Sequence, residues 1–359
     1  MTIEINKLKI LIPVCEFGKS GGYRVLSELA NYWISKGNEV VFLCFYVSDL
    51  PYYPTKADIV WVSNKGKIVN NIITARTKGD FKKMICGLFN YINKHSGEYD
   101  IILANHNITS IPIYFASKTN NYYYIQAYEP EFPLRTIFKL IAWLTYFLPL
   151  KRIVNADIYT KYKNIRSNIV IPPGLDLNIF YPKILEPDNK ETLIVGCIGR
   201  IEEWKGSNDV GEAVKILHEK GYKVILKSAF NSVKYKCHEL VYPDGDENLA
   251  DFYRSLDVLV APGHIQLGAV HYPVIEAMAC NVPVITTGYY PANEQNSFIV
   301  PIKSPEKIAE IIELIMKDYS IVISKAELAK KMIEEFDWEI VSNKFIKVFK
   351  ETVAHENIS

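Results

Sequence analysis

The chain has 359 residues, with 41 Lys and Arg against 40 Asp and Glu, so its formal net charge is +1. This length suggests about two domains. The 49% hydrophobic and 23% charged residues are typical of a folded protein. The near-zero charge argues against a dedicated nucleic-acid-binding protein, which needs a strong positive field. The 24 tyrosines fit a polar neutral ligand but do not establish one.

The cysteine pattern and the N-terminal segment indicate the compartment. The six cysteines are scattered and form no Cys-x-x-Cys pair, which is typical of reduced thiols in a cytosolic protein. Residues 1–9 lack the apolar core of a signal peptide, and no apolar run approaches the ~20 residues of a membrane span. We therefore predict a cytoplasmic protein. Because no His or Cys group has metal-ligand spacing, we expect no metal site.

In the first half of the chain, apolar runs alternate with segments of helical periodicity. Residues 21–36 have apolar side chains at helical spacing, and Gly37 ends this pattern. The expected strands are 8–14, 39–46, 59–62, 99–103 and 122–125. Because these runs are apolar throughout, they predict a parallel sheet covered by helices on both faces.

Residues 135–152 form an apolar and aromatic segment with basic ends, RTIFKLIAWLTYFLPLKR. Such a segment suits the surface of an anionic membrane. Alternatively, it is a helix packed in the core of the first domain. We favour the core interpretation, because apolar helices are common in large domains.

A proline-rich segment at 171–187 separates this first half from a second half of the same kind. The expected strands there are 193–198, 222–227, 239–242, 258–261 and 282–286. The expected helices are 207–220, 248–255, 274–280, 304–317 and 325–353. Two α/β units joined by a linker describe this pattern. Ligands of such sheets bind at the carboxyl ends of the strands, so we expect a site in a cleft between the units.

Two loops that follow strands carry groups suited to an anion. Gly21 and Gly22 let a ligand approach the backbone at a helix start, although a tight strand–helix turn explains them equally well. Arg200 and Lys205 lie in GRIEEWKG, directly after the strand 193–198, and can both point at one diphosphate. Their position at a strand end favours this function over ordinary solvated charges.

A lone glutamate marks a third motif, HYPVIEAMACNVPV, at residues 271–284. Glu276 lies near the start of an apolar helix and needs hydrogen-bond donors there. Ribose hydroxyls would satisfy it, and so would backbone N–H groups of its own helix. Without other observations, the backbone interpretation is the stronger one.

Five segments follow one another along nearly the whole chain. They read GGYRVLSELANYWISKGNEV, IPPGLDLNIFYP, GRIEEWKG, LADFYRSLDVLVAP and IEAMACNVPVITT. In this order and spacing they resemble the family 4 glycosyltransferases of the GT-B fold. The resemblance implies an α/β protein with two Rossmann-like domains facing across a cleft. It implies an acceptor-side domain at 1–170 and a donor-binding domain at 171–336, with a last helix at 337–359 that crosses back to the first domain.

The resemblance also implies a reaction and several donor-binding residues. A nucleoside-diphosphate-sugar donor gives up its sugar with retention of configuration, without a metal or another cofactor. Arg200 and Lys205 resemble the cations that bind the donor diphosphate. Glu276 resembles the second glutamate of the family's Glu-x7-Glu motif, which binds the donor ribose. Gly21 and Gly22 resemble the glycine loop near the transferred group.

Further donor-binding candidates lie around the third motif. His271 and Tyr272 stand where backbone N–H groups of a helix start should meet the phosphates. His264 and Gln266 are candidates for contact with the sugar.

Two departures from the family pattern concern the sugar. Gly268 stands where the first glutamate of Glu-x7-Glu is expected. Residues 124–130, which usually hold an active-site histidine, read YIQAYEP. Together with HYPVIEAMA, this segment is similar to bacterial rhamnosyltransferases and polysaccharide-assembly enzymes. A deoxysugar such as rhamnose lacks a hydroxyl that a carboxylate can bind, which fits the loss of the glutamate.

The place of that histidine is taken by other polar groups, and we expect catalytic residues among Gln126, Tyr128 and Glu129. Glu129 either acts as base or electrostatic partner of the incoming hydroxyl, or pairs with Arg135 and orders the loop. His106, which follows another strand, is a second catalytic candidate.

We therefore predict a retaining, metal-independent glycosyltransferase of the hexosyltransferase type that serves a bacterial surface polysaccharide or lipid-linked glycan. Its expected partners are a nucleotide-sugar donor, a glycan acceptor and the cytoplasmic membrane surface, but no nucleic acid. The alternative is a non-catalytic GT-B subunit that binds glycan or a partner glycosyltransferase. A nucleotide-sugar epimerase would differ from both by activity without an acceptor.

Overall fold

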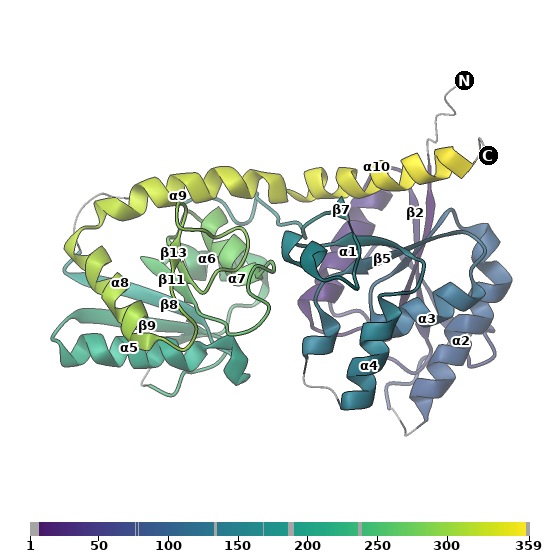
Figure 1. The fold of residues 1–359 in the computed structure, drawn as a ribbon, viewed down its shortest axis with the longest axis horizontal. Helices are drawn as coiled ribbons and strands as arrows, with labels where there is room; N and C mark the ends of the chain where they lie inside the picture. The colour runs from purple at the N-terminus through teal and green to yellow at the C-terminus, as the bar shows by residue number, and fades with distance from the viewer. Residues whose placement is uncertain are drawn as a thin grey trace. The chain divides into compact units, whose positions relative to one another are not determined.

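A computed structural model describes residues 7–75, 77, 79–132, 135–167, 169–185, 190–235 and 239–356. The chain divides into two compact units, which Figure 1 shows as ribbons. The first unit contains the chain up to Gly174 together with the segment that begins at Trp338. The second unit is the continuous stretch Leu175–Asp337.

The first unit is built on a parallel sheet whose described strands have the order β3-β2-β1-β4-β5-β6-β7. The strands are β1 (Lys9–Val14), β2 (Glu39–Phe45), β3 (Asp58–Val62), β4 (Ile101–Ala104), β5 (Asn120–Ile125), β6 (Lys151–Val154) and β7 (Ile169–Val170). The helices are α1 (Gly21–Ser35), α2 (Asp80–His95), α3 (Asn107–Ala116), α4 (Thr136–Thr145) and α10 (Trp338–Glu356).

Alternating tyrosines on β5 show how helices cover both faces of this sheet. Successive side chains of a strand point to opposite faces. Tyr122 and Tyr124 contact Phe349 and Phe345 of α10, with ring centroids 4.9 and 5.0 Å apart. Tyr123 points to the other face, where its ring lies 5.8 Å from that of Tyr146, directly after α4. The tyrosine-rich strand is therefore core on both sides.

The second unit has its own parallel sheet, with the order β10-β9-β8-β11-β12-β13 among the described strands. The strands are β8 (Thr192–Ile198), β9 (Lys223–Ala229), β10 (Glu239–Val241), β11 (Val258–Ala261), β12 (Val284–Thr286) and β13 (Phe298–Ile299). The helices are α5 (Ser207–Glu219), α6 (Gly245–Arg254), α7 (Tyr272–Ala279), α8 (Pro305–Lys317) and α9 (Ser320–Ile333).

Strand β8 shows why this second sheet is also covered on both faces. Leu193 and Val195 belong to a buried cluster with residues of α5 and α8. Ile194 and Ile198 pack against a different cluster, which contains residues of α6, α7 and α9. The apolar-throughout pattern of the strands thus has the physical cause expected from the sequence.

The structure confirms the predicted α/β class and corrects some of the predicted elements. Strands β6, β7 and β13 are not expected from the sequence, and each has four residues or fewer. The single helix predicted at 325–353 is wrong. Helix α9 ends at Ile333, a 3-10 turn spans Glu334–Phe336, and α10 begins at Trp338. Asp337 has an extended ψ of 134°, which interrupts the helical path.

The structure also contradicts the interpretation of 135–152 as an ordinary core helix. Ala142 and Thr145 of α4 are buried, but most apolar side chains of α4 are exposed to solvent. Among the described residues, no helix combines the length and apolar character that crossing a bilayer requires.

Candidate functional site

Polar candidates gather at the carboxyl ends of the strands in each unit, as expected for doubly wound sheets. In the second unit they come from the loop after β8, the loop after β11 and the start of α7. In the first unit they come from the segments after β1, β4 and β5. The candidate residues of each unit are described separately.

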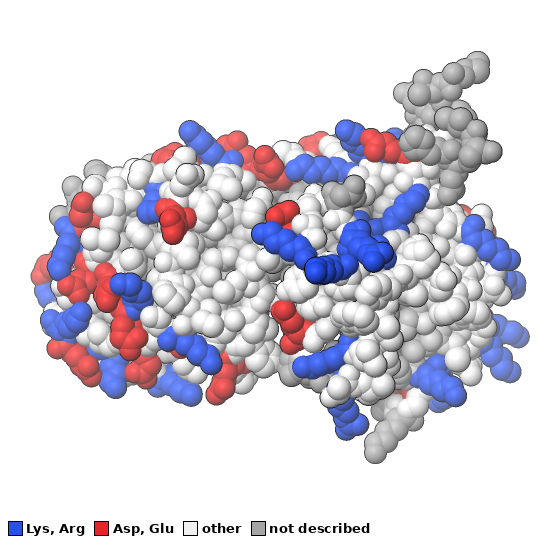
Figure 2. Space-filling view, viewed as in Figure 1, with Lys and Arg blue, Asp and Glu red and all other residues white. Residues whose placement is uncertain are grey.

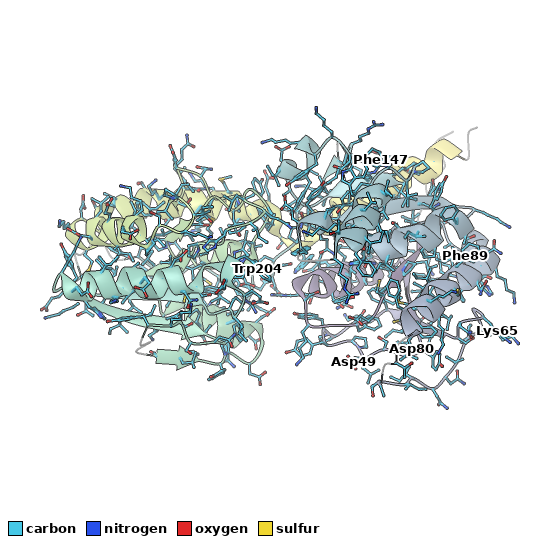
Figure 3. The ribbon with its side chains drawn as sticks, turned by 60° about the horizontal axis from the view of Figure 1, so that its bottom comes forward. Asp49, Lys65, Asp80, Phe89, Phe147 and Trp204 are labelled. Carbon is cyan, nitrogen blue, oxygen red and sulfur yellow. The ribbon has the colours of Figure 1, made fainter. Side chains whose placement is uncertain are left out.

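The loop between β8 and α5 is fixed by two glycines. A Cβ atom on Gly199 would lie 1.8 Å from the carbonyl oxygen of Asn231, so no side chain fits there. Gly206 has a φ of +72°, and its Cβ would lie 2.1 Å from the carbonyl oxygen of Pro262. The backbone N–H of Arg200 donates to Ser207 Oγ at 2.9 Å, which closes the loop over the start of α5. Trp204 lies in this loop (Figure 3).

The loop brings Arg200 and Lys205 to one pocket with His271, Ser207 and the ends of β8 and β11. Burial lowers the pKa of Lys205, and the nearby Arg200 lowers it further. Burial also holds the pKa of His271 well below its ordinary value, and Lys205 and Arg200 act in the same direction. His271 Nδ1 is buried without a partner among the described residues. Positive charge on Arg200 and Lys205 therefore disfavours the protonated form of His271, and Arg200 disfavours that of Lys205.

A bound anion would relieve this repulsion. It would favour the charged form of Lys205 and accept hydrogen bonds from the Arg200 guanidinium. Among the described residues, no carboxylate lines the pocket. The arrangement is therefore suited to a phosphate or diphosphate group.

Glu276 of α7 is buried beside this pocket and already has one internal donor. The hydroxyl of Tyr253 donates to Glu276 Oε2 at 2.8 Å. Burial, and secondly the Glu276 carboxylate, raise the pKa of Tyr253 well above its ordinary value. Tyr272 is the first residue of α7 and is partly buried against the core of the unit. Burial of Glu276 confirms that it needs donors, while its contact with ribose remains a prediction.

In the loop after β11, His264 contacts a carboxylate of α5. Its Nε2 lies 2.7 Å from Asp209 Oδ2, and both side chains are largely buried. The backbone N–H of His264 donates to the carbonyl oxygen of Trp204. This hydrogen bond connects the loop after β11 to the loop after β8. His264 thus has a protein partner, and its contact with a sugar stays a prediction. Gly268 has a φ of +87°, a conformation in which a glutamate would be strained.

In the first unit, the glycine loop meets the segment after β5. Gly21 and Gly22 are the first residues of α1, next to the end of β1. Gln126 Nε2 donates to the carbonyl oxygen of Gly22 at 3.4 Å. A Cβ on Gly22 would lie 3.4 Å from the same amide, which is within van der Waals contact. Two of the predicted site segments therefore lie side by side.

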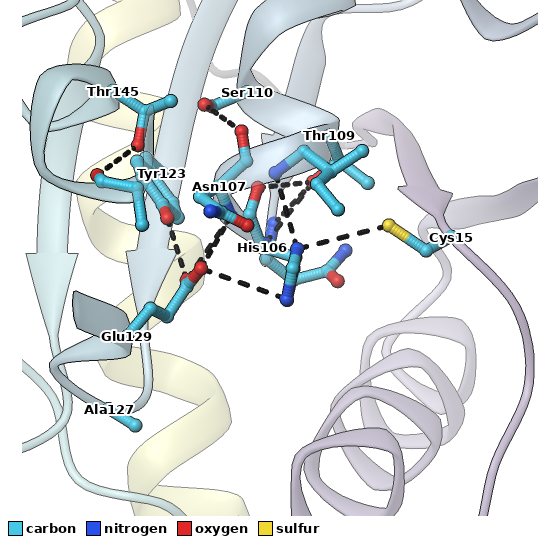
Figure 4. Close-up of polar contacts among 12 residues, drawn as sticks. Cys15, His106, Asn107, Thr109, Ser110, Tyr123, Ala127, Glu129 and Thr145 are labelled. Atoms are coloured by element: carbon cyan, nitrogen blue, oxygen red, sulfur yellow. Dashed lines mark hydrogen bonds and ion pairs between the residues drawn. The ribbon is translucent and has the colours of Figure 1, made fainter. Parts of the chain in front are cut away.

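Glu129 is the buried centre of a polar network, which Figure 4 shows. It is 8% exposed and begins a 3-10 turn, Glu129–Glu131. The backbone N–H of Asn107 donates to both of its oxygens, at 3.2 and 2.9 Å, and the hydroxyl of Tyr123 donates to Oε1 at 2.8 Å. Burial raises the pKa of Glu129, while His106, Asn107 and Tyr123 oppose that shift.

His106 faces this carboxylate from the start of α3. Its Nδ1 accepts a hydrogen bond from the backbone N–H of Ile108 at 3.2 Å, so in the neutral ring the proton lies on Nε2. Nε2 lies 3.7 Å from Glu129 Oε2. The thiol of Cys15 lies 3.9 Å from Nδ1, on the opposite side of the ring (Figure 4). The imidazole is 46% exposed, so it can face both solvent and the carboxylate.

The structure thus brings His106 and Glu129 together, and it does not place Arg135 among the described partners of Glu129. Tyr128 lies differently. Its ring stacks on that of Tyr162 at 4.0 Å and on that of Tyr146 at 5.7 Å. This stack holds the loop, and a catalytic role of Tyr128 stays a prediction.

Three residues of these networks were not identified from the sequence: Tyr123, Asp209 and Tyr253. Tyr123 belongs to a strand of consecutive tyrosines, and a hydroxyl on an otherwise apolar strand was the available signal. Asp209 is an acidic residue in the first turn of α5, where helix capping explains it equally well. Tyr253 had no local signal, because its partner Glu276 is distant in sequence. Within the described residues, no three His, Cys, Asp or Glu side chains gather into a metal site.

Comparison with known proteins shows what this chain is similar to. Residues 192–318, which contain Arg200, Lys205, His271 and Glu276, match the family model described as "Glycosyl transferases group 1". The chain is 28% identical over 232 residues to the capsular polysaccharide biosynthesis glycosyltransferase CapM of Staphylococcus aureus, covering 54% of this chain and 60% of CapM. The chain spans about half the length of the curated relatives it matches. These matches support a relation to group 1 glycosyltransferases.

Solved structures show the fold. Sucrose-phosphate synthase from Thermosynechococcus elongatus has a TM-score of 0.77 at 15% identity, covering 97% of this chain and 100% of that one. HepE of Anabaena, solved with UDP and glucose, has a TM-score of 0.69 at 14% identity, covering 96% and 100%. The chain therefore has the GT-B fold predicted from its motifs.

Proposed function

We propose that this protein is a retaining glycosyltransferase of group 1, which moves a sugar from a nucleoside-diphosphate-sugar donor to a hydroxyl of a bacterial surface-polysaccharide or lipid-linked glycan. The proposal assigns the donor to the second unit and the acceptor to the first. It includes a deoxysugar such as rhamnose as the transferred group, a reaction without metal, and a peripheral position at the cytoplasmic membrane.

One observation carries the proposal: Arg200, Lys205 and His271 surround one pocket that lacks a carboxylate among its described lining residues. During transfer, the bond from the anomeric carbon to the diphosphate oxygen breaks, and negative charge grows on the leaving diphosphate. Preorganised cations stabilise that charge, and loss of one such group typically lowers the rate by about 10²–10³-fold. HepE, a protein of the same fold, was solved with UDP and glucose, which supports a nucleotide ligand.

The acceptor assignment rests on the network around Glu129. The acceptor oxygen forms its new bond to the anomeric carbon on the face from which the diphosphate departs. Its proton passes to an oxygen of that diphosphate or to a carboxylate. Glu129, with a raised pKa and the Nε2–H of His106 beside it, supplies a carboxylate suited to this proton or to the positive charge of the sugar.

Nucleotide binding tests the donor assignment directly. Isothermal titration with UDP, GDP and dTDP should give binding by at least one of them. We expect Arg200→Ala and Lys205→Ala each to weaken that binding by about 10- to 100-fold, because each removes a charge-assisted contact. Lys215→Ala, on the exposed side of α5 and paired with Glu212, should bind as the wild type does.

Each other outcome has a defined meaning. No binding by any nucleotide would favour the non-catalytic subunit over the enzyme. Unchanged binding in both pocket variants would refute the diphosphate assignment. For a binding nucleotide, the anomeric configuration of the product, measured by NMR with its sugar donor and an acceptor extract, tests retention.

A further inference from the structure

We propose that the outer face of helix α4 docks on an anionic membrane surface. This inference rests on the proposed function only for its lipid-linked acceptor, and it names the part of the chain that contacts the bilayer. The surface consists of Ile137, Leu140, Trp143, Leu144 and Phe147, which we call the α4 stripe.

The α4 stripe has the spacing of one helix face. Ile137, Leu140 and Leu144 follow one another at intervals of three and four residues, and Phe147 continues this spacing just beyond the helix. The side chains of the stripe are between 40% and 57% exposed. The opposite face carries the buried Ala142, Thr145 and Tyr146 and packs on the first unit. The helix is therefore apolar on both sides, and within the described part of the first unit only the side with Ala142, Thr145 and Tyr146 is buried.

An aromatic pair ends the stripe. The rings of Trp143 and Phe147 meet edge to face, with centroids 4.6 Å apart, and both remain exposed. Phe147 is labelled in Figure 3. Aromatic side chains with one apolar and one solvated side are common where proteins meet the boundary between water and lipid tails.

The basic residues near the α4 stripe favour lipids with negatively charged headgroups. Arg135 and Lys139 are exposed at the first turns of the helix, and Lys151 and Arg152 follow it. Between residues 132 and 156 the sequence contains no Asp or Glu. Figure 2 shows the surface over α4 as largely white, with basic side chains at its margin. Apolar insertion combined with attraction of basic groups to anionic headgroups is how interfacial helices bind membranes.

A bilayer fits this face better than a second copy of the chain does. The stripe lies on a single helix, and the only polar group among its five side chains is the indole N–H of Trp143. A protein interface of lasting affinity usually combines such a ridge with a complementary groove and hydrogen bonds. A lipid surface needs neither, since its tails accept any apolar shape and its headgroups supply the negative charge.

Vesicle binding tests the proposal without any sugar or nucleotide. We expect the full chain to co-sediment with phosphatidylcholine vesicles that contain phosphatidylglycerol, and only weakly with phosphatidylcholine alone. Leu140→Gln combined with Leu144→Gln should weaken this binding by about 100-fold, because two large apolar side chains no longer enter the lipid. The matched control is Leu314→Gln combined with Leu328→Gln on α8 and α9, whose side chains are 46% and 44% exposed. This control should bind as tightly as the wild type.

Two further measurements identify the contact. Arg135→Gln combined with Lys139→Gln should weaken binding by about 30-fold, and only to vesicles with phosphatidylglycerol. Brominated lipid should quench the fluorescence of the wild type more than that of Trp143→Phe, because the Trp143 ring enters the acyl region. Equal quenching in both proteins would place the contact elsewhere and overturn the proposal.

Other outcomes separate this inference from the proposed function. If the Leu140→Gln/Leu144→Gln protein bound vesicles like the wild type, the α4 stripe would not be the membrane contact. If the wild type formed dimers without lipid and this variant dissolved them, the stripe would be a self-association surface instead. Nucleotide binding by the second unit is measured on the same proteins, so failure of membrane binding leaves the glycosyltransferase proposal standing, and the reverse also holds.

Discussion

At the scale of single residues, Glu129 is the centre of the polar network in the first unit. Its carboxylate is buried, and it receives donors from the backbone of α3 and from Tyr123 of β5. A carboxylate held between two elements fixes the loop after β5 relative to the loop after β4. The same network keeps His106 at the edge of the site with its Nε2 toward the carboxylate.

Replacing Glu129 with Gln should affect stability and activity in different ways. Burial raises the pKa of Glu129 in the folded protein. The stability that results is fully present below the ordinary pKa of a glutamate, and it is lost as pH rises through the folded-state pKa. The variant cannot ionise, so its free energy of unfolding relative to the wild type should increase as pH rises across that window. Transfer activity should fall by about 10²–10³-fold if the carboxylate acts in the reaction.

Urea unfolding at a series of pH values and sugar-transfer rates measure the two effects. Glu131→Gln is the matched control, because Glu131 lies on the same 3-10 turn, is exposed and accepts from the Tyr162 hydroxyl at 2.9 Å. That control should show neither effect. A Glu129→Gln protein with full activity would leave the residue a purely structural role.

The sequence suggests candidate site residues more readily than it predicts which of them lie together. Arg200 and Lys205 follow a strand within one short motif, so local spacing is enough to bring them together. His106 and Glu129 follow different strands, and only the order of β4 beside β5 makes them neighbours. His264 was a candidate for contact with the sugar, and its contact with Asp209 was not predicted because Asp209 lies on another element. Pairings across elements depend on tertiary packing, which periodicity does not contain.

At the scale of elements, α10 completes the first unit. Its Phe345 and Phe349 meet Trp33 of α1 at ring distances of 5.7 and 5.6 Å, and they also meet the tyrosines of β5. Trp338 at its start packs against Gly174, where a Cβ would lie 2.1 Å from the indole ring. The helix therefore forms part of the core rather than an appendage.

Phe345→Ala should lower the free energy of unfolding of the first unit by about 3–5 kcal/mol, because it opens a cavity beside Trp33 and Tyr124. Urea unfolding followed by tryptophan fluorescence and by nucleotide binding would separate the two units. Ile340→Ala on the same helix is the control, since that side chain is 42% exposed. Equal stability of the Phe345→Ala protein and wild type would show that α10 contributes little to the core.

Most helices and strands are predictable from the sequence. The prediction fails for very short strands and for a helix that is interrupted at one residue. Continuous apolar runs locate the long central strands of both sheets, since buried parallel strands have that pattern. The two-residue strands β7 and β13 are too short to leave a periodic signal. The helix pattern runs through Asp337, because a change of backbone direction at one residue does not alter the surrounding periodicity. The exposed outer face of α4 was not predicted, because apolar composition does not show which side of a helix is covered by protein.

At the scale of the whole molecule, the proposed donor-binding residues and the network around Glu129 belong to different compact units. We therefore expect a nucleotide without sugar to protect only the second unit. In hydrogen exchange with saturating nucleotide, amides of the loop after β8 and the start of α7 should exchange at least about tenfold more slowly. Amides around Glu129 should change only when the complete nucleotide-sugar is present. Protection of the first unit by nucleotide alone would contradict the assignment of the donor to the second.

The discontinuity of the first unit has a consequence for synthesis on the ribosome. Its sheet is translated first, but α10, which covers Trp33 and the tyrosines of β5, is translated only after the whole of Leu175–Asp337. The second unit is continuous and can fold as soon as it emerges. Until α10 has been synthesised, the nascent first sheet keeps an uncovered aromatic face. Chaperone binding should therefore be strongest while Leu175–Asp337 is being translated.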